Sequence, residues 1–267
     1  MMASAAPRAW HRFSNELRFI RFAFYFVAIA ALTMSLRHIE FIPEFLYDAP
    51  AQVQDFFVRM WPLDTAYYGK SVHAALIETL NIATLGTLLS LLLAVPVGML
   101  AANNLVPFAP LNYLAKLILV SSRSVNSLVW ALLFIAIFGP GALAGTLAIA
   151  FRSIGFVGKL FGEALEETQA GPIDALKAVG APHASVFTKG YWPQVKPAFW
   201  SIALFRWDIN VRESAVLGLV GAGGIGMAMD SAMNLFRWDQ VAVVLITIFS
   251  VVIVAEVVVT SIRKRVI

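Results

Sequence analysis

The chain has 267 residues, of which 60% are hydrophobic and only 13% are charged, and its formal net charge is +4. A soluble domain carries roughly 25% charged residues, so this composition excludes an ordinary soluble protein and predicts an all-α polytopic membrane protein. Cysteine is absent, which excludes disulfides, thiolate metal sites and cysteine nucleophiles.

The remaining polar composition also narrows the possible partners. The histidines show no metal-binding spacing, so we expect no metal site and no cofactor. They are His11, His38, His73 and His183. The basic residues lie near the ends of apolar runs and form no stripe that would suit nucleic acid. We therefore expect the lipid bilayer, and not nucleic acid, as a partner.

The first predicted element is an apolar helix over residues 19–36, close to the ~20 residues that a membrane span requires. A cleaved signal peptide is the alternative, with residues 28–30 as its cleavage pattern. Because this pattern lies inside the apolar run, we favour a retained helix. Four arginines precede or begin the run, namely Arg8, Arg12, Arg18 and Arg21.

An acidic segment, residues 37–72, follows the first span and is interrupted by Pro43, Pro50 and Pro62. This pattern predicts an extramembrane segment with one short interfacial helix. We accordingly divide the chain into an N-terminal part, residues 1–72, and a membrane-spanning core, residues 73–267. Five further spans are predicted in this core, over residues 74–102, 111–138, 142–161, 198–220 and 241–262, with a turn at Gly139-Pro140-Gly141.

The orientation of the spans is predicted from the basic residues near their ends. Six spans place both termini on the same side of the membrane, and the basic N-terminus and Arg263-Lys264-Arg265 both favour the cytoplasm. Residues 162–197 are then cytoplasmic as well, and the acidic segment lies outside.

The interval 162–197 contains a short segment, Asp174–Gly180, whose sequence is not typical of a flexible loop. Pro172 is predicted to start a helix there. Gly180 supplies its stop, and Pro182 prevents continuation. A compact helix and turn between two spans are suited to docking against another protein.

This segment resembles the cytoplasmic coupling motif of ABC importer permeases, Glu-Ala-Ala-x-x-x-Gly followed by Ile-x-Leu-Pro. Asp174 stands in place of the glutamate, Leu176 in place of the second alanine, and Gly190 and Trp192 in place of the isoleucine and leucine. The resemblance implies that a separate ATPase docks on this segment. The residues expected to form the docking site are Asp174, Ala175, Leu176, Gly180, Ala181 and Pro193.

A charged group inside the fifth span, residues 206–214, is the second candidate site. Charge within hydrocarbon costs ~2.5–3.5 kcal/mol per residue unless it is paired or hydrated. Two pairs at i,i+4 spacing, Asp208 with Arg212 and Arg206 with Asn210, would partly neutralise the group. The group then either holds helices together or lines a path suited to an anion, and both interpretations stay open. The expected path residues are Asn81, Arg123, Asn126, Arg206, Asp208, Asn210, Arg212 and Glu213.

No catalytic site is predicted. Gly69-Lys70-Ser71 is a fragment of a phosphate-binding loop, but Asp64 stands where the first glycine belongs, so ATP hydrolysis is expected on another subunit. The Gly221–Gly226 run has no strand before it, and we interpret it as a break where backbones approach closely. No catalytic constellation supports an intramembrane enzyme.

Over its whole length, the chain resembles the permease subunit of a bacterial phosphonate-type ABC importer. The similarity is carried by Arg212–Gly226, Leu128–Phe134 and the docking segment. It implies six transmembrane helices in the type I, methionine-permease-like architecture, in the inner membrane. It also implies two permease copies, as a homodimer, two cytoplasmic ABC ATPase subunits and an extracytoplasmic substrate-binding protein.

The substrate class implied by the resemblance is phosphonate, phosphite or a related phosphorus oxyanion. A methionine-type or other small-solute ABC permease is the nearest alternative. An ion-coupled secondary transporter is an alternative from another class, although no inverted or tandem repeat is evident.

Overall fold

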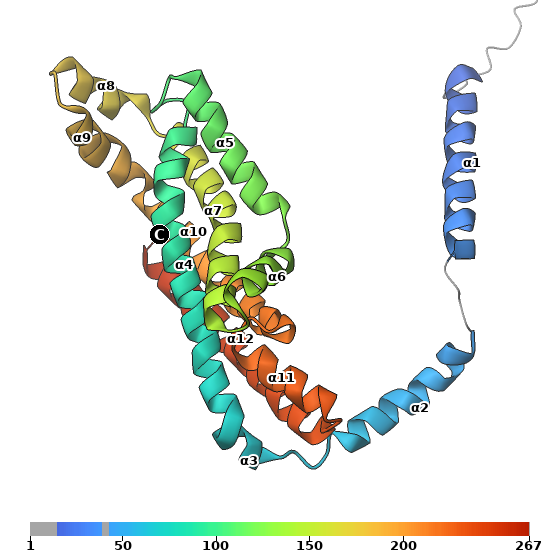
Figure 1. Cartoon of the computed structure of the whole chain (residues 1–267). Helices are drawn as coiled ribbons and strands as arrows, with labels where there is room; N and C mark the ends of the chain where they lie inside the picture. The colour runs from blue at the N-terminus through green and yellow to red at the C-terminus, as the bar shows by residue number, and fades with distance from the viewer. Residues whose placement is uncertain (1–14, 39–42, 267) are drawn as a thin grey trace, which may run out of the picture. The chain divides into compact units, whose positions relative to one another are not determined.

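The computed structural model describes residues 15–38 and 43–266, which form helices and short connections with no β-strand (Figure 1). The predicted basic positions Arg8 and Arg12 lie outside the described residues. The chain divides into two compact units, residues 1–56 and 57–267.

The first unit contains α1 (Asn15–His38) and most of α2 (Pro43–Arg59). The apolar run of α1 has no residue buried inside the structure, as expected for a helix whose surroundings are lipid or another protein. The predicted short interfacial helix corresponds to α2, which is longer than expected at 17 residues. Acidic Glu44, Asp48 and Asp55 alternate along it with an apolar stripe that includes Leu46 and Val53.

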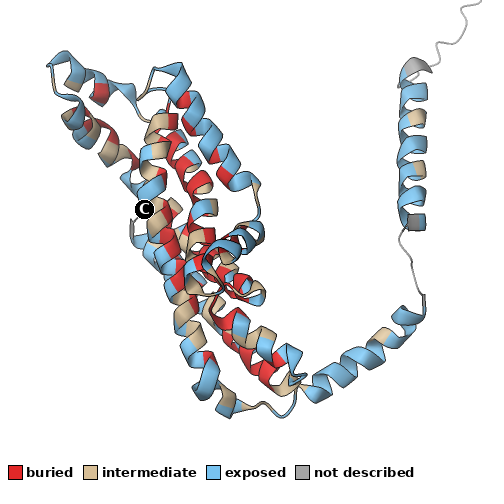
Figure 2. Cartoon of the chain, in the orientation of Figure 1, coloured by how far each residue is buried: buried red, intermediate tan, exposed pale blue. Residues whose placement is uncertain are grey.

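The second unit is a helical bundle organised around α7. Its α-helices are α3 (Thr65–Tyr67), α4 (His73–Ala101), α5 (Ala109–Ser124), α6 (Ser127–Phe138), α7 (Ala142–Glu166), α8 (Ala170–Ala178), α9 (His183–Val186), α10 (Trp192–Leu217), α11 (Ile225–Asn234) and α12 (Trp238–Val266). Two π-helical segments, η1 (Tyr68–Val72) and η2 (Phe187–Tyr191), and one 3-10 segment, η3 (Gly218–Val220), complete it. Figure 2 shows the buried residues along the inner sides of α4, α7 and α10.

Small residues let α7 lie directly against its neighbours. A Cβ atom at Gly98 of α4 would lie 2.7 Å from the carbonyl oxygen of Gly158, and one at Gly155 would lie 2.3 Å from the carbonyl oxygen of Leu119 in α5. Gly162 similarly faces the Gly98 carbonyl. Apolar side chains give helices in lipid little reason to associate, so this close backbone packing is what holds α4, α5 and α7 together.

The structure corrects the predicted third span. Residues 111–138 do not form one helix, because α5 and α6 meet at a bend of 92°. Val125 is extended, and the side chain of Asn126 accepts a hydrogen bond of 3.0 Å from the Leu128 N–H, which starts a new helix. Five described helices are long and apolar enough to cross a membrane, and the bent pair brings the number to six.

The boundaries of the predicted docking interval are also corrected. The α7 helix continues to Glu166, past the predicted end at residue 161, and α10 begins at Trp192, before the predicted start at residue 198. Pro193 lies in the first turn of α10, directly after the π-helical segment η2 (Phe187–Tyr191), and such a segment occurs where the regular α-helical hydrogen bonding is interrupted. The interval between these helices is therefore residues 167–191, which is shorter than the predicted 162–197.

The Gly221–Gly226 run is a backbone break, as predicted. Gly223 has a φ of +86°, and a Cβ there would lie 2.8 Å from the Ala142 nitrogen at the start of α7. The Ile225 N–H, at the start of α11, donates a 2.7 Å hydrogen bond to the Thr79 hydroxyl of α4. Glycine therefore allows the chain after α10 to turn back against α4 and α7.

Candidate functional site

Three pockets, with volumes of about 310, 360 and 250 Å³, follow one another along α5, α7 and α10. The first two share Arg152 and Glu213, and the last two share Arg123. We call this row of pockets the groove. Its charged lining residues are Lys116, Arg123, Arg152, Lys159, Glu163, Glu166, Arg206, Arg212 and Glu213, which are six basic and three acidic side chains.

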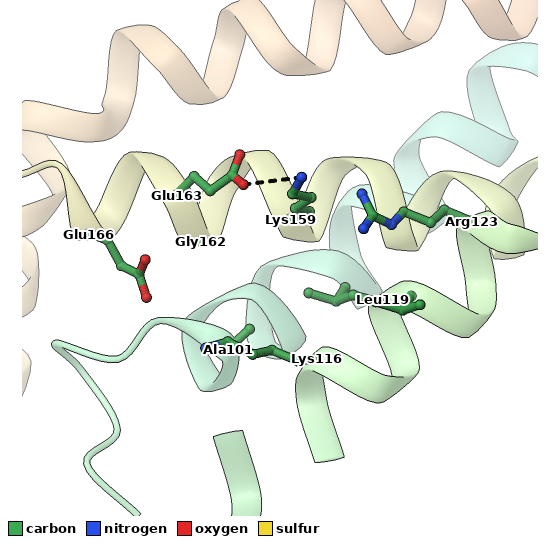
Figure 3. A pocket seen from close by; sticks show the side chains of 9 residues that line it. Ala101, Lys116, Leu119, Arg123, Lys159, Gly162, Glu163 and Glu166 are labelled. Atoms are coloured by element: carbon green, nitrogen blue, oxygen red, sulfur yellow. Dashed lines mark ion pairs between the residues drawn. The ribbon is translucent and has the colours of Figure 1, made fainter. Parts of the chain in front are cut away.

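Helical spacing explains why these side chains share one face. Arg152, Lys159 and Glu166 are seven residues apart on α7, with Phe156 and Glu163 between them at intervals of three or four. Residues at such spacing lie along one side of a helix. Figure 3 shows the pocket of 250 Å³, where α5 carries Lys116, Leu119 and Arg123 and α7 carries Lys159, Glu163 and Glu166.

Glu213 of α10 is the centre of the ion-pair network in the groove. One of its carboxylate oxygens pairs with Arg152 of α7, and the other lies 3.2 Å from a guanidinium nitrogen of Arg206. Arg206 is only 2% exposed. Its Nε donates to the Ser153 hydroxyl at 2.8 Å, and its guanidinium lies 5.6 Å from the Phe156 ring centroid. Arg206 is therefore held by α7 from two directions.

Only one of the two predicted i,i+4 pairs forms. Asp208 and Arg212 make an ion pair, as the spacing predicted. No direct hydrogen bond joins the side chains of Arg206 and Asn210. Both bond the Ser153 hydroxyl of α7, and the buried Asn210 amide also donates to the Thr87 hydroxyl of α4 at 2.8 Å. Asp208 and Asn210 do not line the groove. These two residues thus match the first interpretation, in which span-five polar groups hold helices together.

The other expected path residues divide between the groove and the surface. Arg123 and Asn126 line the groove, whereas Asn81 is exposed on α4 and lines none of the three pockets. Within the described ranges, Arg123 has no carboxylate at ion-pair distance. The groove therefore contains a cation whose charge is not neutralised by a direct contact.

Sequence reasoning did not assign Lys116, Lys159, Glu163 and Glu166 to the path. Glu163 and Glu166 lie beyond the predicted end of the fourth span, so they were assigned to the extramembrane interval. The signal that could have found them is the charge spacing of three and four residues from Arg152 to Glu166, which predicts a continuous helix with one polar face.

The docking segment ends α8 in a tight, regular turn. Gly180 has a φ of +73°, its N–H donates to the Lys177 carbonyl at 3.0 Å, and the Ala181 N–H donates to the Leu176 carbonyl at 3.1 Å. This pair of bonds is the Schellman arrangement, which requires a left-handed residue at the Gly180 position. The predicted start at Pro172 was wrong by two residues, because α8 begins at Ala170.

The docking segment is attached to the bundle by one side and exposed on the other. Ile173 is buried, and α8 packs on Gly190, where an added Cβ would lie 3.3 Å from the Leu176 side chain. Gln194 of α10 accepts a 2.9 Å hydrogen bond from the Gln169 N–H, just before α8. Asp174 and Ala175 are exposed, as a docking surface requires.

Replacing Gly180 tests the importance of this turn. Gly180→Val is expected to weaken binding of a docked ATPase about tenfold, since a left-handed backbone costs an L-residue ~1–2 kcal/mol and deforms the end of α8. The measurement is co-purification of a tagged ATPase with the protein in detergent. Gly180→Asn is the matched control, because asparagine tolerates this conformation, and it should bind normally. Equal binding by the valine variant would contradict the assignment.

The relationship of the chain to known proteins follows from its sequence. Residues 94–267 match the family described as the binding-protein-dependent transport system inner membrane component. The chain belongs to this family.

Individual relatives of this permease are similar over much of its length. The phosphite transport system permease protein PtxC of Stutzerimonas stutzeri is 36% identical over 190 residues, which are 71% of this chain and 69% of that protein. The phosphate-import permease protein PhnE of Mycolicibacterium smegmatis is 35% identical over 237 residues, covering 88% of this chain and 44% of that protein.

The fold of the permease also matches solved structures. A chain of the methionine ABC transporter MetNI in an inward-facing conformation superposes with a TM-score of 0.66 at 21% identity, over 73% of this permease and 96% of that chain. The predicted helical architecture of a type I ABC importer permease is thereby confirmed. So is the prediction of a multi-pass inner-membrane permease subunit, over the alternative of an ion-coupled secondary transporter.

Proposed function

We propose that the permease forms the membrane path of an ATP-driven importer for phosphite, phosphonate or a related phosphorus oxyanion. Two permease copies, two cytoplasmic ATPase subunits and an extracytoplasmic substrate-binding protein make up the transporter. ATP hydrolysis takes place on the ATPase subunits, which dock on residues 170–193. Both termini and this docking segment face the cytoplasm.

The observation that carries the proposal is the excess of basic side chains in the groove. All three acids of the groove already have partners: Glu163 lies 3.3 Å from Lys159, Glu166 accepts hydrogen bonds from Asn103, and Glu213 holds two arginines. Arg123 is left without an acidic partner. Its planar fork of N–H donors suits an oxyanion, whereas a zwitterion such as methionine would also need a free carboxylate for its ammonium group, and all three acids of the groove already have partners.

The groove also has the properties that passage requires. An ion must bind strongly enough to enter and weakly enough to leave, which is achieved by several adjacent sites of moderate strength. Arg152 and Lys159 of α7 and Arg123 of α5 provide such a series along the groove, and none of them is fully buried. Two of its relatives, named for phosphite and phosphate, support the same substrate class.

Uptake by the complete transporter in proteoliposomes tests this proposal. With its ATPase and binding protein, the wild-type permease should take up phosphite or methylphosphonate in an ATP-dependent way and should not take up methionine. Arg123→Gln should lower the uptake rate about tenfold, since a charge-assisted hydrogen bond contributes roughly 1.5–3 kcal/mol. Arg123→Lys should retain part of the rate.

A matched control separates a local effect from a general loss of charge. Lys264 is an exposed cation near the end of α12, outside the groove, and Lys264→Gln should transport normally. Methionine uptake, or normal phosphite uptake by Arg123→Gln, would contradict the proposed path.

A further inference from the structure

A second polar cavity lies at the opposite end of the second unit from the docking segment. Its volume is about 320 Å³, and it is enclosed by the α3–η1 turn, the end of α11 and the start of α12. In Figure 1, α3 and α11 are at one end of the bundle, and α8 and α9 are at the other. We call it the polar pocket. Its main polar lining residues are Asp64, Lys70, Ser71, Ser231, Arg237 and Gln240.

The α3–η1 turn brings Lys70 and Ser71 to this cavity through an irregular helix. These residues belong to the fragment Gly69-Lys70-Ser71, which does not form an ATP-binding loop. They lie in the π-helical segment Tyr68–Val72, where each hydrogen bond joins residues five apart, one residue more than in an α-helix. The extra residue rotates the side chains before η1 relative to those of α4. The Tyr67 hydroxyl donates to the Ala228 carbonyl of α11 at 3.2 Å, and this hydrogen bond holds the α3–η1 turn against α11 on the other side of the polar pocket.

Arg237 is fixed on the opposite wall by the turn that ends α11. Its N–H donates to the Ala232 carbonyl at 3.0 Å, and the Phe236 N–H donates to the Met233 carbonyl at 3.0 Å. This is again a Schellman arrangement, with Phe236 at a φ of +56° in the position that glycine usually takes. The backbone of Arg237 is therefore held in place even though its side chain is exposed.

The electrostatic balance of the polar pocket is positive. Both carboxylate oxygens of Asp64 accept hydrogen bonds, one from the Tyr67 N–H at 3.3 Å and one from the Gln240 side chain at 3.0 Å. Across residues 15–38 and 43–266, neither Lys70 nor Arg237 has a carboxylate at ion-pair distance. Two cations and two serine hydroxyls thus surround one cavity.

We infer that the polar pocket binds a tetrahedral phosphorus oxyanion at the extracytoplasmic end of the permease. Lys70 and Arg237 supply the charge, and the hydroxyl of Ser71 donates a further hydrogen bond, whereas the Ser231 hydroxyl already donates to the Met227 carbonyl at 2.8 Å. The volume is large enough for the anion together with several waters, each of which occupies ≈ 30 Å³ in the liquid. This inference rests on the proposed function, because it takes the passenger to be an oxyanion that arrives from outside.

The lack of cysteine permits a local test of binding that needs no transport. A single cysteine replaces Leu235, which lines the polar pocket but donates no hydrogen bond to an anion. In nanodiscs, inorganic phosphate or phosphite should slow the reaction of this cysteine with a charged, impermeant thiol reagent about tenfold at saturation, with ionic strength held constant by chloride. A cysteine at Thr188, at the docking end of the bundle, should react at the same rate with and without phosphate.

Neutralising the two cations identifies the groups responsible. With Lys70→Gln and Arg237→Gln added to the Leu235→Cys protein, protection by phosphate should disappear. Lys189→Gln, an exposed cation at the other end of the unit, should leave the protection unchanged. The inference is overturned if phosphate gives no protection in the protein that retains Lys70 and Arg237.

A protein-docking role for the same surface is distinguished by a separate measurement. Capture of the substrate-free binding protein should be unchanged by Lys70→Gln and Arg237→Gln, and a loss of capture would show a docking surface for that protein instead.

The failure of this inference is also distinct from that of the proposed function. If the wild type imports phosphite but the Leu235 cysteine is not protected, only the polar pocket is refuted. If the cysteine is protected but no phosphorus oxyanion is imported, the transport proposal fails.

Discussion

Glu213→Gln is expected to lower the stability of the permease by about 3–5 kcal/mol, because it leaves a buried arginine without its acid. Arg206 is only 2% exposed and lies 3.2 Å from Glu213. A glutamine of the same shape keeps the packing but removes the negative charge that Arg206 and Arg152 share. The measurement is the temperature at which half of the detergent-solubilised protein is lost from the monodisperse fraction, which should fall by several degrees.

Two further variants make this expectation specific. Glu163→Gln removes an acid from an exposed i,i+4 pair with Lys159, where ion pairs contribute ~0–1 kcal/mol, so it should melt like the wild type. Adding Arg206→Met to Glu213→Gln removes the unpaired buried cation and should restore part of the lost stability. A wild-type melting temperature for Glu213→Gln alone would show that Arg206 is hydrated and not held by its acid.

Gly155→Ala is expected to destabilise the permease by about 2 kcal/mol, although alanine normally favours a helix. The added Cβ would lie 2.3 Å from the Leu119 carbonyl oxygen, so α5 and α7 would have to separate. Separation would also break the 3.1 Å hydrogen bond from the Gly155 N–H to the Ser122 hydroxyl. Gly155→Val should cost about 3 kcal/mol, since its side chain is larger.

The same substitution at Gly171 is the matched control. Gly171 lies in α8, and a Cβ there would meet no atom within 4 Å. Gly171→Ala should therefore be neutral or slightly stabilising in the same thermal assay. If Gly155→Ala also left stability unchanged, the close packing of α5 against α7 would not be a source of stability.

The sequence predicts the helical, membrane-spanning fold well, because the signal for a span is a long apolar run on one continuous segment. It also predicts the Gly180 stop, since glycine at the end of a helix has a local conformational meaning. The bend at Val125 and Asn126 was missed. The polar run Ser121–Ser127 lies at this break, but a serine-rich stretch also suits the packing face of a continuous membrane helix, so the local pattern did not distinguish the two. The second helix starts where Asn126 caps it.

Only part of the candidate site was predicted, because several of its contacts join residues that are far apart in the sequence. Spacing on one helix correctly predicted the Asp208–Arg212 pair, which is four residues apart. It could not predict that Glu213 pairs with Arg152, which is 61 residues away on α7. A prediction based on neighbours within one helix therefore assigned Arg206 to Asn210, whereas its partners are Ser153 and Glu213.

Composition and local pattern by themselves determined that this chain spans a membrane and approximately where its apolar helices lie, and they predict which short segment between spans docks a partner. These properties depend on the transfer of each residue to hydrocarbon and on turns of a few residues, and both are encoded locally. Only the tertiary structure decided which charges hold helices together and which line the groove. That outcome depends on which faces of α5, α7 and α10 meet, because the strength of a charge pair depends on its distance and burial, and packing of separate helices sets both.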